Sequence, residues 1–162
     1  MSSYLAIDPG PTKSAFVLWK DERIFFSGIV TNETLLHGIW AKQTGVHANS
    51  CAIEMIASYG MAVGREVFET CVWIGRYYEA WSGANGSRPL LIPRLAVKVH
   101  HCCSAKAKDS NIRQALIDRF GAPGTKRAPG VTYGLKADTW QAMALAVYAA
   151  DTEAARRNGA VA

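Results

Sequence analysis

The sequence predicts an α/β domain built on a mixed sheet. The first thirty residues contain three short β-prone runs joined by tight turns, and later strand-like runs alternate with segments of helical periodicity. The chain has 162 residues, 49% of them apolar, and domains of about 100–150 residues can bury one core. We therefore expect a single domain over 1–157 and a C-terminal tail over 158–162.

Five strands are expected. Short connections with turn chemistry, Asp8-Pro9-Gly10-Pro11 and Lys20-Asp21-Glu22, favour antiparallel pairing of the first three strands into a meander. Two further apolar runs follow a helical segment and a long loop. The expected strands are 4–7, 14–19, 23–30, 51–53 and 90–92.

Four helices are expected from the spacing of apolar residues: 33–43, 62–81, 106–120 and 137–155. Thr31 or Asn32 can cap the first of them. The second, 62–81, is apolar nearly all round, which is typical of a helix that is deeply buried or pairs with another subunit. The stretch 94–103 shows no preference between helix and strand.

The net charge of +5 is unevenly distributed. Residues 1–84 hold 6 basic and 8 acidic residues, whereas residues 85–162 hold 12 basic and 5 acidic ones. A basic half can bind nucleic acid or an anionic membrane surface, or can be ordinary surface charge. No run approaches the ~20 apolar residues that span a bilayer, and the N-terminus lacks the features of a secretion signal. We expect a cytoplasmic protein with no membrane partner.

Three acidic residues stand where buried elements begin or end. Asp8 and Glu54 each follow an apolar strand, and Asp138 opens the last helix. An acid at the end of a buried strand is costly unless it is solvated, paired or bound to metal, and carboxylates are ligands that Mg²⁺ selects. Each acid alone also fits a plain alternative: an Asx turn, a solvated strand end or a helix-start charge.

The combined motifs resemble the RuvC family of Holliday-junction resolvases. Asp8-Pro9-Gly10 follows the first strand, Ala52-Ile53-Glu54 forms the fourth, and Ala137-Asp138 opens an Ala-rich helix. The resemblance covers about 4–148. It implies a ribonuclease-H-like fold, in which an antiparallel three-stranded meander and two parallel strands form a five-stranded mixed sheet flanked by helices.

The resemblance also implies an activity. Members of this family are homodimeric endonucleases that depend on Mg²⁺, which Mn²⁺ can replace, and that resolve four-way DNA junctions by paired nicks. By resemblance, Asp8, Glu54 and Asp138 are metal ligands, and the helix over 62–81 forms the dimer interface. The expected chemistry is in-line attack of a metal-activated water on the phosphodiester, with a lysine stabilising charge on the phosphorus.

The sequence departs from the family at several positions, which suggests a divergent, phage-borne branch. Where the family has a second acid one turn into the last helix, this chain has Gln141, and either Gln141 or Asp109 could be a fourth ligand. Lys98 matches the first basic position of the family, but the second falls on Asp109, so we expect Lys98 and Lys108 at the phosphate. Tyr59 is the candidate for the aromatic that wedges into the junction, or it packs in its loop.

Basic residues are concentrated between 88 and 127, where nine of them face only two acids. Such a run can be a solvated face, but beside a carboxylate cluster it suits a phosphodiester backbone, and no segment looks like a base-reading helix. The expected DNA-binding residues are Tyr59, Arg88, Arg94, Lys98, Lys106, Lys108, Arg113, Lys126 and Arg127.

Two other functions stay open on the sequence alone. Gln141 favours a junction- or branched-DNA-binding protein with weak or no nuclease activity. A YqgF-like nuclease acting on RNA, or a relative that cuts flap DNA, would keep the fold and change the substrate. An ATPase of the actin and sugar-kinase superfamily is excluded, because it needs two such domains and the chain is too short.

Overall fold

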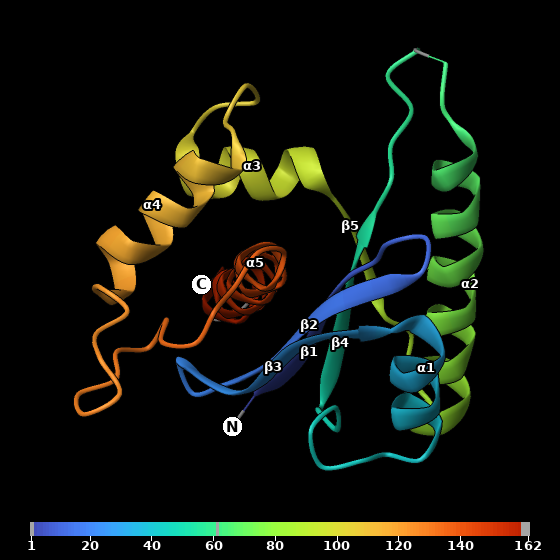
Figure 1. Ribbon diagram of the computed structural model, residues 1–162, viewed down its shortest axis with the longest axis horizontal. Coiled ribbons are helices and arrows are strands. Elements are labelled where there is room, and N and C mark those ends of the chain that lie inside the picture. Colours follow the sequence, from blue (N-terminus) through green and yellow to red (C-terminus); the bar gives the residue numbers. More distant parts are fainter. Residues whose placement is uncertain (1, 61, 160–162) are drawn as a thin grey trace.

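The computed structural model describes residues 2–60 and 62–159 and contains a five-stranded sheet (Figure 1). The strand order is β3-β2-β1-β4-β5, with β1–β2 and β2–β3 antiparallel and β1–β4 and β4–β5 parallel. This confirms the meander and the two parallel strands. The strands are β1 (Ser3–Asp8), β2 (Lys13–Lys20), β3 (Arg23–Thr31), β4 (Ser50–Met55) and β5 (Leu90–Pro93).

Helices cover both faces of the sheet (Figure 1). They are α1 (Asn32–Trp40), α2 (Arg65–Asn85), α3 (Arg94–Cys102), α4 (Asp109–Phe120) and α5 (Thr139–Gly159). Side chains alternate across a strand: Tyr4 and Ala6 pack into the core with α5, whereas Leu5 and Ile7 pack into the core with α1 and α2. The outer layer beyond α5 is formed by α3 and α4.

The helix expected over 62–81 is shifted toward the C-terminus. It begins after Gly64, whose extended backbone caps α2, and it ends at Gly86, which has the left-handed φ of 66°. One face of α2 is buried, including Trp73 and Tyr77. Phe68 and Val72 are 62% and 63% exposed. The expectation of deep burial is therefore wrong, because only one face meets the sheet; pairing with another subunit stays a prediction.

Other helix boundaries differ by a few residues. Thr31 caps α1 by accepting a hydrogen bond from the Thr34 N–H at 3.3 Å. The uncertain stretch after β5 is helix α3, and α4 starts at Asp109 rather than 106. The last helix starts at Thr139, since Ala137 has a φ of 41°, outside the helical region.

The ends of the described chain add two observations. The tail expected over 158–162 overlaps the last turn of α5 at its first two residues, and 160–162 lie outside the described residues. In the described part of the chain, none of the helices is long and apolar enough to cross a membrane.

Candidate functional site

The sheet register brings Asp8 and Glu54 to one edge of the sheet. Strands β1 and β4 run parallel, and Ile7 pairs with Ile53 one residue before the two acids. The carboxyl ends of β1 and β4 thus coincide. Both acids are partly buried, and the Glu54 side chain is only 14% exposed. The strand-end interpretation of these two residues is supported by this register.

The acids at this edge influence one another. Burial, and then the charge of Glu54, raises the pKa of Asp8 to about 8; Asp138 and Asp109 act in the same direction, and Arg94 opposes them. Burial also raises the pKa of Glu54, although Arg94 lowers it. The charges of three other carboxylates therefore reach Asp8, and their repulsion adds to the burial that disfavours its ionised form.

Arg94 lies within this acidic cluster. Its Nη1 donates hydrogen bonds to Oε1 and Oε2 of Glu54 at 3.1 and 3.3 Å, and its Nη2 donates to Asp109. These contacts arise because α3 starts directly after β5, whose Pro93 pairs with the residue after Glu54. Lys98, one turn further along α3, also lowers the pKa of Glu54, by less than burial, Arg94 and Asp109 change it.

Asp138 stands at the start of α5, outside the buried pair. Its side chain is exposed, and its carbonyl accepts the N–H groups of Gln141 at 3.0 Å and Ala142 at 3.1 Å, which places it at the N-cap position. Gln141, which replaces the expected acid, is buried in the first turn of the helix. Asp109, the other candidate for a fourth ligand, is 65% exposed and pairs with Arg94.

The donor set fits a divalent cation in part. Asp8 and Glu54 offer hard oxygen donors, and burial raises the pKa of each, so a cation would stabilise their ionised forms. Within residues 2–60 and 62–159, however, no three His, Cys, Asp or Glu side chains lie close enough together to hold a metal ion. In this structure Arg94 binds the Glu54 oxygens, and Asp138 is exposed at the start of α5.

The expected basic residues have different surroundings. Lys106 and Lys108 are exposed just before α4, which begins at Asp109. The guanidinium of Arg113 lies over the Trp140 ring, 4.9 Å from its centroid. Arg88 precedes β5 and so lies at the amino end of that strand, opposite the edge that carries the acids. The eight expected basic residues therefore do not all lie around the carboxylates.

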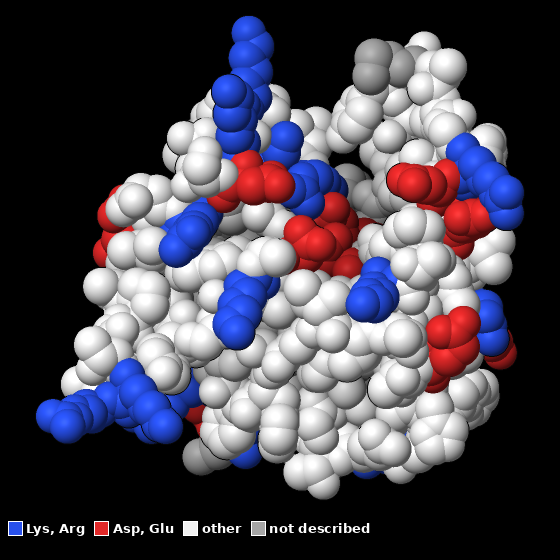
Figure 2. Space-filling view, in the orientation of Figure 1, with Lys and Arg blue, Asp and Glu red and all other residues white. Residues whose placement is uncertain are grey.

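The charged surface shows the same division (Figure 2). Acidic side chains gather near the centre of this face, beside a hollow, with basic side chains around them. Further basic side chains stand apart at the lower left, where Figure 1 draws the loop between α4 and α5 that carries Lys126 and Arg127. Tyr59 is 66% exposed in the loop after β4.

A buried polar network supports the turn that presents Asp8. The Asn32 Nδ2 donates to the Gly10 carbonyl at 2.9 Å, while its Oδ1 accepts from Ser14 at 2.7 Å and from Tyr77 at 3.0 Å. Sequence reasoning did not identify these three residues. Asn32 looked like a helix cap, and nothing in the spacing linked it to a tyrosine on α2. A Cβ at Gly10 would lie 2.5 Å from the Lys13 carbonyl oxygen, so this turn requires glycine.

Solved structures place this arrangement among known folds. Thermus thermophilus RuvC superposes with a TM-score of 0.65 at 15% sequence identity, over 90% of this chain and 92% of that chain. T. thermophilus RuvC in complex with a Holliday junction substrate gives a TM-score of 0.64 at 14% identity, over 91% and 92%. No protein-family model and no curated protein matches the sequence. The chain therefore has the ribonuclease-H-like fold in its RuvC-like form, as the strand-end motifs predicted.

Proposed function

We propose that the protein is a metal-dependent, structure-selective endonuclease that resolves four-way DNA junctions by paired nicks. The observation that carries the proposal is the pair of partly buried carboxylates, Asp8 and Glu54, at the coincident ends of two parallel strands. Burial and Glu54 raise the pKa of Asp8 most, and Asp138 is close enough to raise it further. Its support from comparison is the shared fold with a RuvC structure that was solved on a Holliday junction.

Each part of the site has a role in this proposal. Asp8, Glu54 and Asp138 would hold the cation, once Asp138 approaches the other two. When bound, Mg²⁺, or Mn²⁺ in its place, would supply the Lewis acidity for attack of water on the phosphodiester and for departure of the leaving oxygen. Lys98, whose charge acts on Glu54 from α3, would stabilise the negative charge that develops on the phosphate.

Branched DNA and a second copy of the chain are the proposed partners. Paired nicks need two sites, and a two-fold dimer supplies them. Phe68 and Val72 lie four residues apart on α2 and therefore on one side of the helix, where both are largely exposed. We assign the dimer interface to this side of α2. Tyr59, in the loop that leads to α2, is the proposed contact with unpaired bases at the junction.

One observation favours the alternative of a junction-binding protein without nuclease activity. The acid expected one turn into α5 is the buried Gln141, and no three acidic, His or Cys side chains of the described residues converge on one point. The two functions differ in one assay, in which binding and cleavage of a labelled four-way junction are followed with Mg²⁺ and with Ca²⁺. Binding with both ions and cleavage with Mg²⁺ supports the nuclease; binding without cleavage supports the alternative.

The substrate class is tested by competition in the same assay. Unlabelled four-way junction, flap DNA, linear duplex and structured RNA are each added to the labelled junction. We expect the unlabelled junction to compete best, since no segment looks like a base-reading helix and recognition would follow backbone shape. Stronger competition and cleavage with RNA would assign the fold to RNA processing instead.

A further inference from the structure

Arg94 differs from the other basic residues in what it binds. It pairs with two carboxylates from two different elements, Glu54 of β4 and Asp109 of α4, while its own backbone opens α3. Burial lowers the pKa of Arg94, but the charges and hydrogen bonds of Glu54 and Asp109 outweigh that effect and raise it. The guanidinium is therefore a fixed positive charge in the acidic cluster.

The contact with Glu54 uses the atoms that a metal would need. Both Glu54 oxygens accept hydrogen bonds from the same nitrogen of Arg94, at 3.1 and 3.3 Å. The Glu54 side chain is only 14% exposed, so few other approaches to these oxygens exist. A cation bound to either oxygen would also be repelled by the guanidinium a few ångströms away.

We propose that Arg94 is a positioning residue that occupies the Glu54 carboxylate in place of a divalent cation and must release it before the cation binds. Asp109 provides the alternative partner, because it already pairs with the other terminal nitrogen of Arg94 and is exposed enough to follow it. The inference rests on the proposed function in one respect, since it takes Glu54 as a metal ligand. It changes the expected role of Arg94 from DNA contact to control of metal binding.

The proposal predicts that removing the guanidinium strengthens metal binding. Mn²⁺ alone is titrated into the full chain, without DNA, by isothermal calorimetry. For Arg94→Gln we expect the Kd to fall about tenfold, equivalent to about 1.4 kcal/mol. For Arg94→Lys we expect a fall of about threefold, because an ammonium keeps the charge but lacks the planar fork of the guanidinium. Arg156→Gln, which removes an exposed arginine of α5, is the matched control for net charge, with an unchanged Kd.

Thermal unfolding gives a second readout that does not depend on activity. Without metal, Arg94→Gln should melt at a lower temperature than wild type, since it leaves the partly buried Glu54 unpaired. Saturating Mn²⁺ should then raise the melting temperature of Arg94→Gln more than that of wild type. A purely structural role would lower the melting temperature and leave the Kd unchanged.

The outcomes separate this proposal from the proposed function. If wild type binds Mn²⁺ and both Arg94 variants bind it no more tightly, the role of Arg94 is overturned and the metal-dependent function stands. If neither wild type nor the variants bind Mn²⁺, both are overturned. Should Arg94→Gln fail to fold by circular dichroism, Arg94→Lys decides: a Kd equal to or above that of wild type contradicts the proposal.

Discussion

At the scale of single residues, the site gathers several carboxylates, and two of them are held in place by the sheet. Asp8 and Glu54 are held by the sheet, whereas Asp138 is exposed at a helix start. Burial raises the pKa values of both strand-end acids, and the charge of Glu54 raises that of Asp8 further, so a nearby cation would stabilise the ionised form of each. The guanidinium of Arg94 already places one positive charge beside Glu54.

The Asn32 network should be needed for stability. Asn32→Ala removes the acceptor that the buried Ser14 and Tyr77 hydroxyls share and the donor to the Gly10 carbonyl, and it leaves the two hydroxyls mainly with each other, 3.0 Å apart. We expect the free energy of unfolding to fall by about 2–3 kcal/mol, the cost of leaving buried polar groups unsatisfied. Urea unfolding measures it. Asn158→Ala, at an exposed position of α5, is the control, and an equal effect of the two substitutions would contradict the role of the network.

Lys98 is expected to act on the reacting phosphate. Its charge reaches Glu54 from the same helix as Arg94. Lys98→Gln should slow single-turnover cleavage of a junction about 100-fold, as loss of one charge-stabilising group does, while the Kd for the junction changes far less. Arg156→Gln controls for the lost charge. Equal losses in binding and cleavage would indicate instead that Lys98 only contacts the DNA backbone.

The sequence located the carboxylates better than it assigned their neighbours. Asp8 and Glu54 could be predicted because strand ends are local features, set by apolar runs and turn residues. The pairing of Arg94 with Glu54 joins residues 40 positions apart, so no local pattern reveals it. The sequence therefore placed Arg94 among the DNA contacts. The pairing of Arg94 with Asp109 could not be predicted either, because it depends on the tertiary contact between α3 and α4.

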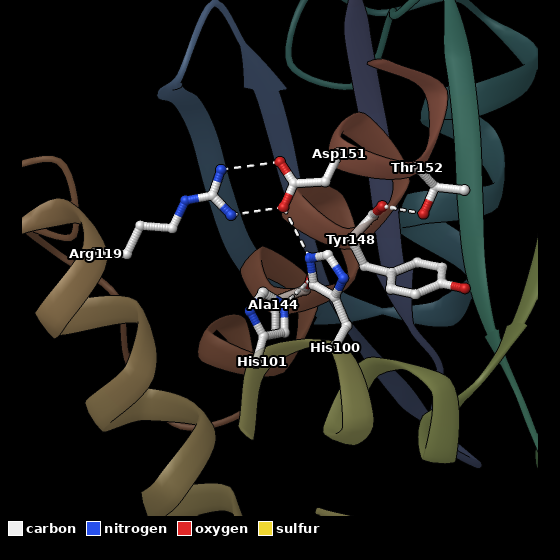
Figure 3. A network of polar contacts seen from close by, with 7 residues as sticks. All are labelled: His100, His101, Arg119, Ala144, Tyr148, Asp151 and Thr152. Atoms are coloured by element: carbon white, nitrogen blue, oxygen red, sulfur yellow. Dashed lines mark hydrogen bonds and ion pairs between the residues drawn. The ribbon is translucent and has the colours of Figure 1, made fainter. Parts of the chain in front are cut away.

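At the scale of elements, a polar network joins three helices on the outer side of the sheet (Figure 3). Asp151 of α5 accepts from Arg119 of α4 at 2.5 and 2.9 Å, and its Oδ2 lies 2.8 Å from His100 Nε2 of α3. His101 Nε2 lies 2.8 Å from the Ala144 carbonyl oxygen. These contacts fix α3, and with it Arg94 and Lys98, against α5.

This network predicts a pH-dependent contribution to stability. The hydrogen bond from Arg119 lowers the pKa of Asp151 below its ordinary value of 3.8, burial opposes this, and His100 adds to it. A lowered carboxyl pKa stabilises the fold above the ordinary value and loses that effect as the pH falls through the folded value. Asp151→Asn should cost about 1 kcal/mol at pH 7, and less below pH 3.8.

Urea unfolding of wild type and Asp151→Asn at pH 7, 5, 4 and 3 checks this dependence. Asp118→Asn is the control, because Asp118 pairs with the neutral amide of Gln114 on an exposed face of α4. A difference between wild type and Asp151→Asn that stays constant from pH 7 to pH 3 would contradict the assigned cause.

Element boundaries show where sequence reasoning reached its limit. The strands were located within one or two residues because turn residues bound them. The stretch that forms helix α3 was left undecided between helix and strand; its apolar Val97 and Val99 flank Lys98, an alternation that also fits a strand, and only Val97 of the nine residues is buried. The end of α2 was expected too early, at Trp81, because Ser82-Gly83 resembles the start of a loop. The helix runs through both residues to Asn85, and the Ser82 hydroxyl donates to the Tyr78 carbonyl at 2.8 Å.

At the scale of the whole molecule, the exposed side of α2 should determine the oligomeric state. We expect wild type to sediment as a dimer and Phe68→Glu to sediment as a folded monomer, because a charge replaces an apolar side chain that is 62% exposed in the single chain. Phe25→Glu, at a comparably exposed position of β3, should leave the dimer intact. A monomeric wild type, or a dimeric Phe68→Glu, would exclude this interface.

In the proposed function, the carboxylates at the ends of β1 and β4 carry out metal-dependent cleavage of DNA junctions. The most direct measurement compares wild type and Asp8→Asn on a synthetic Holliday junction, with Mg²⁺ for cleavage and Ca²⁺ for binding. Asn has nearly the volume of Asp but cannot ionise, so the substitution removes a carboxylate from the end of β1 and changes little volume. We predict that Asp8→Asn binds the junction with nearly the affinity of wild type and does not cut it. Full cleavage by Asp8→Asn with Mg²⁺ would contradict the account.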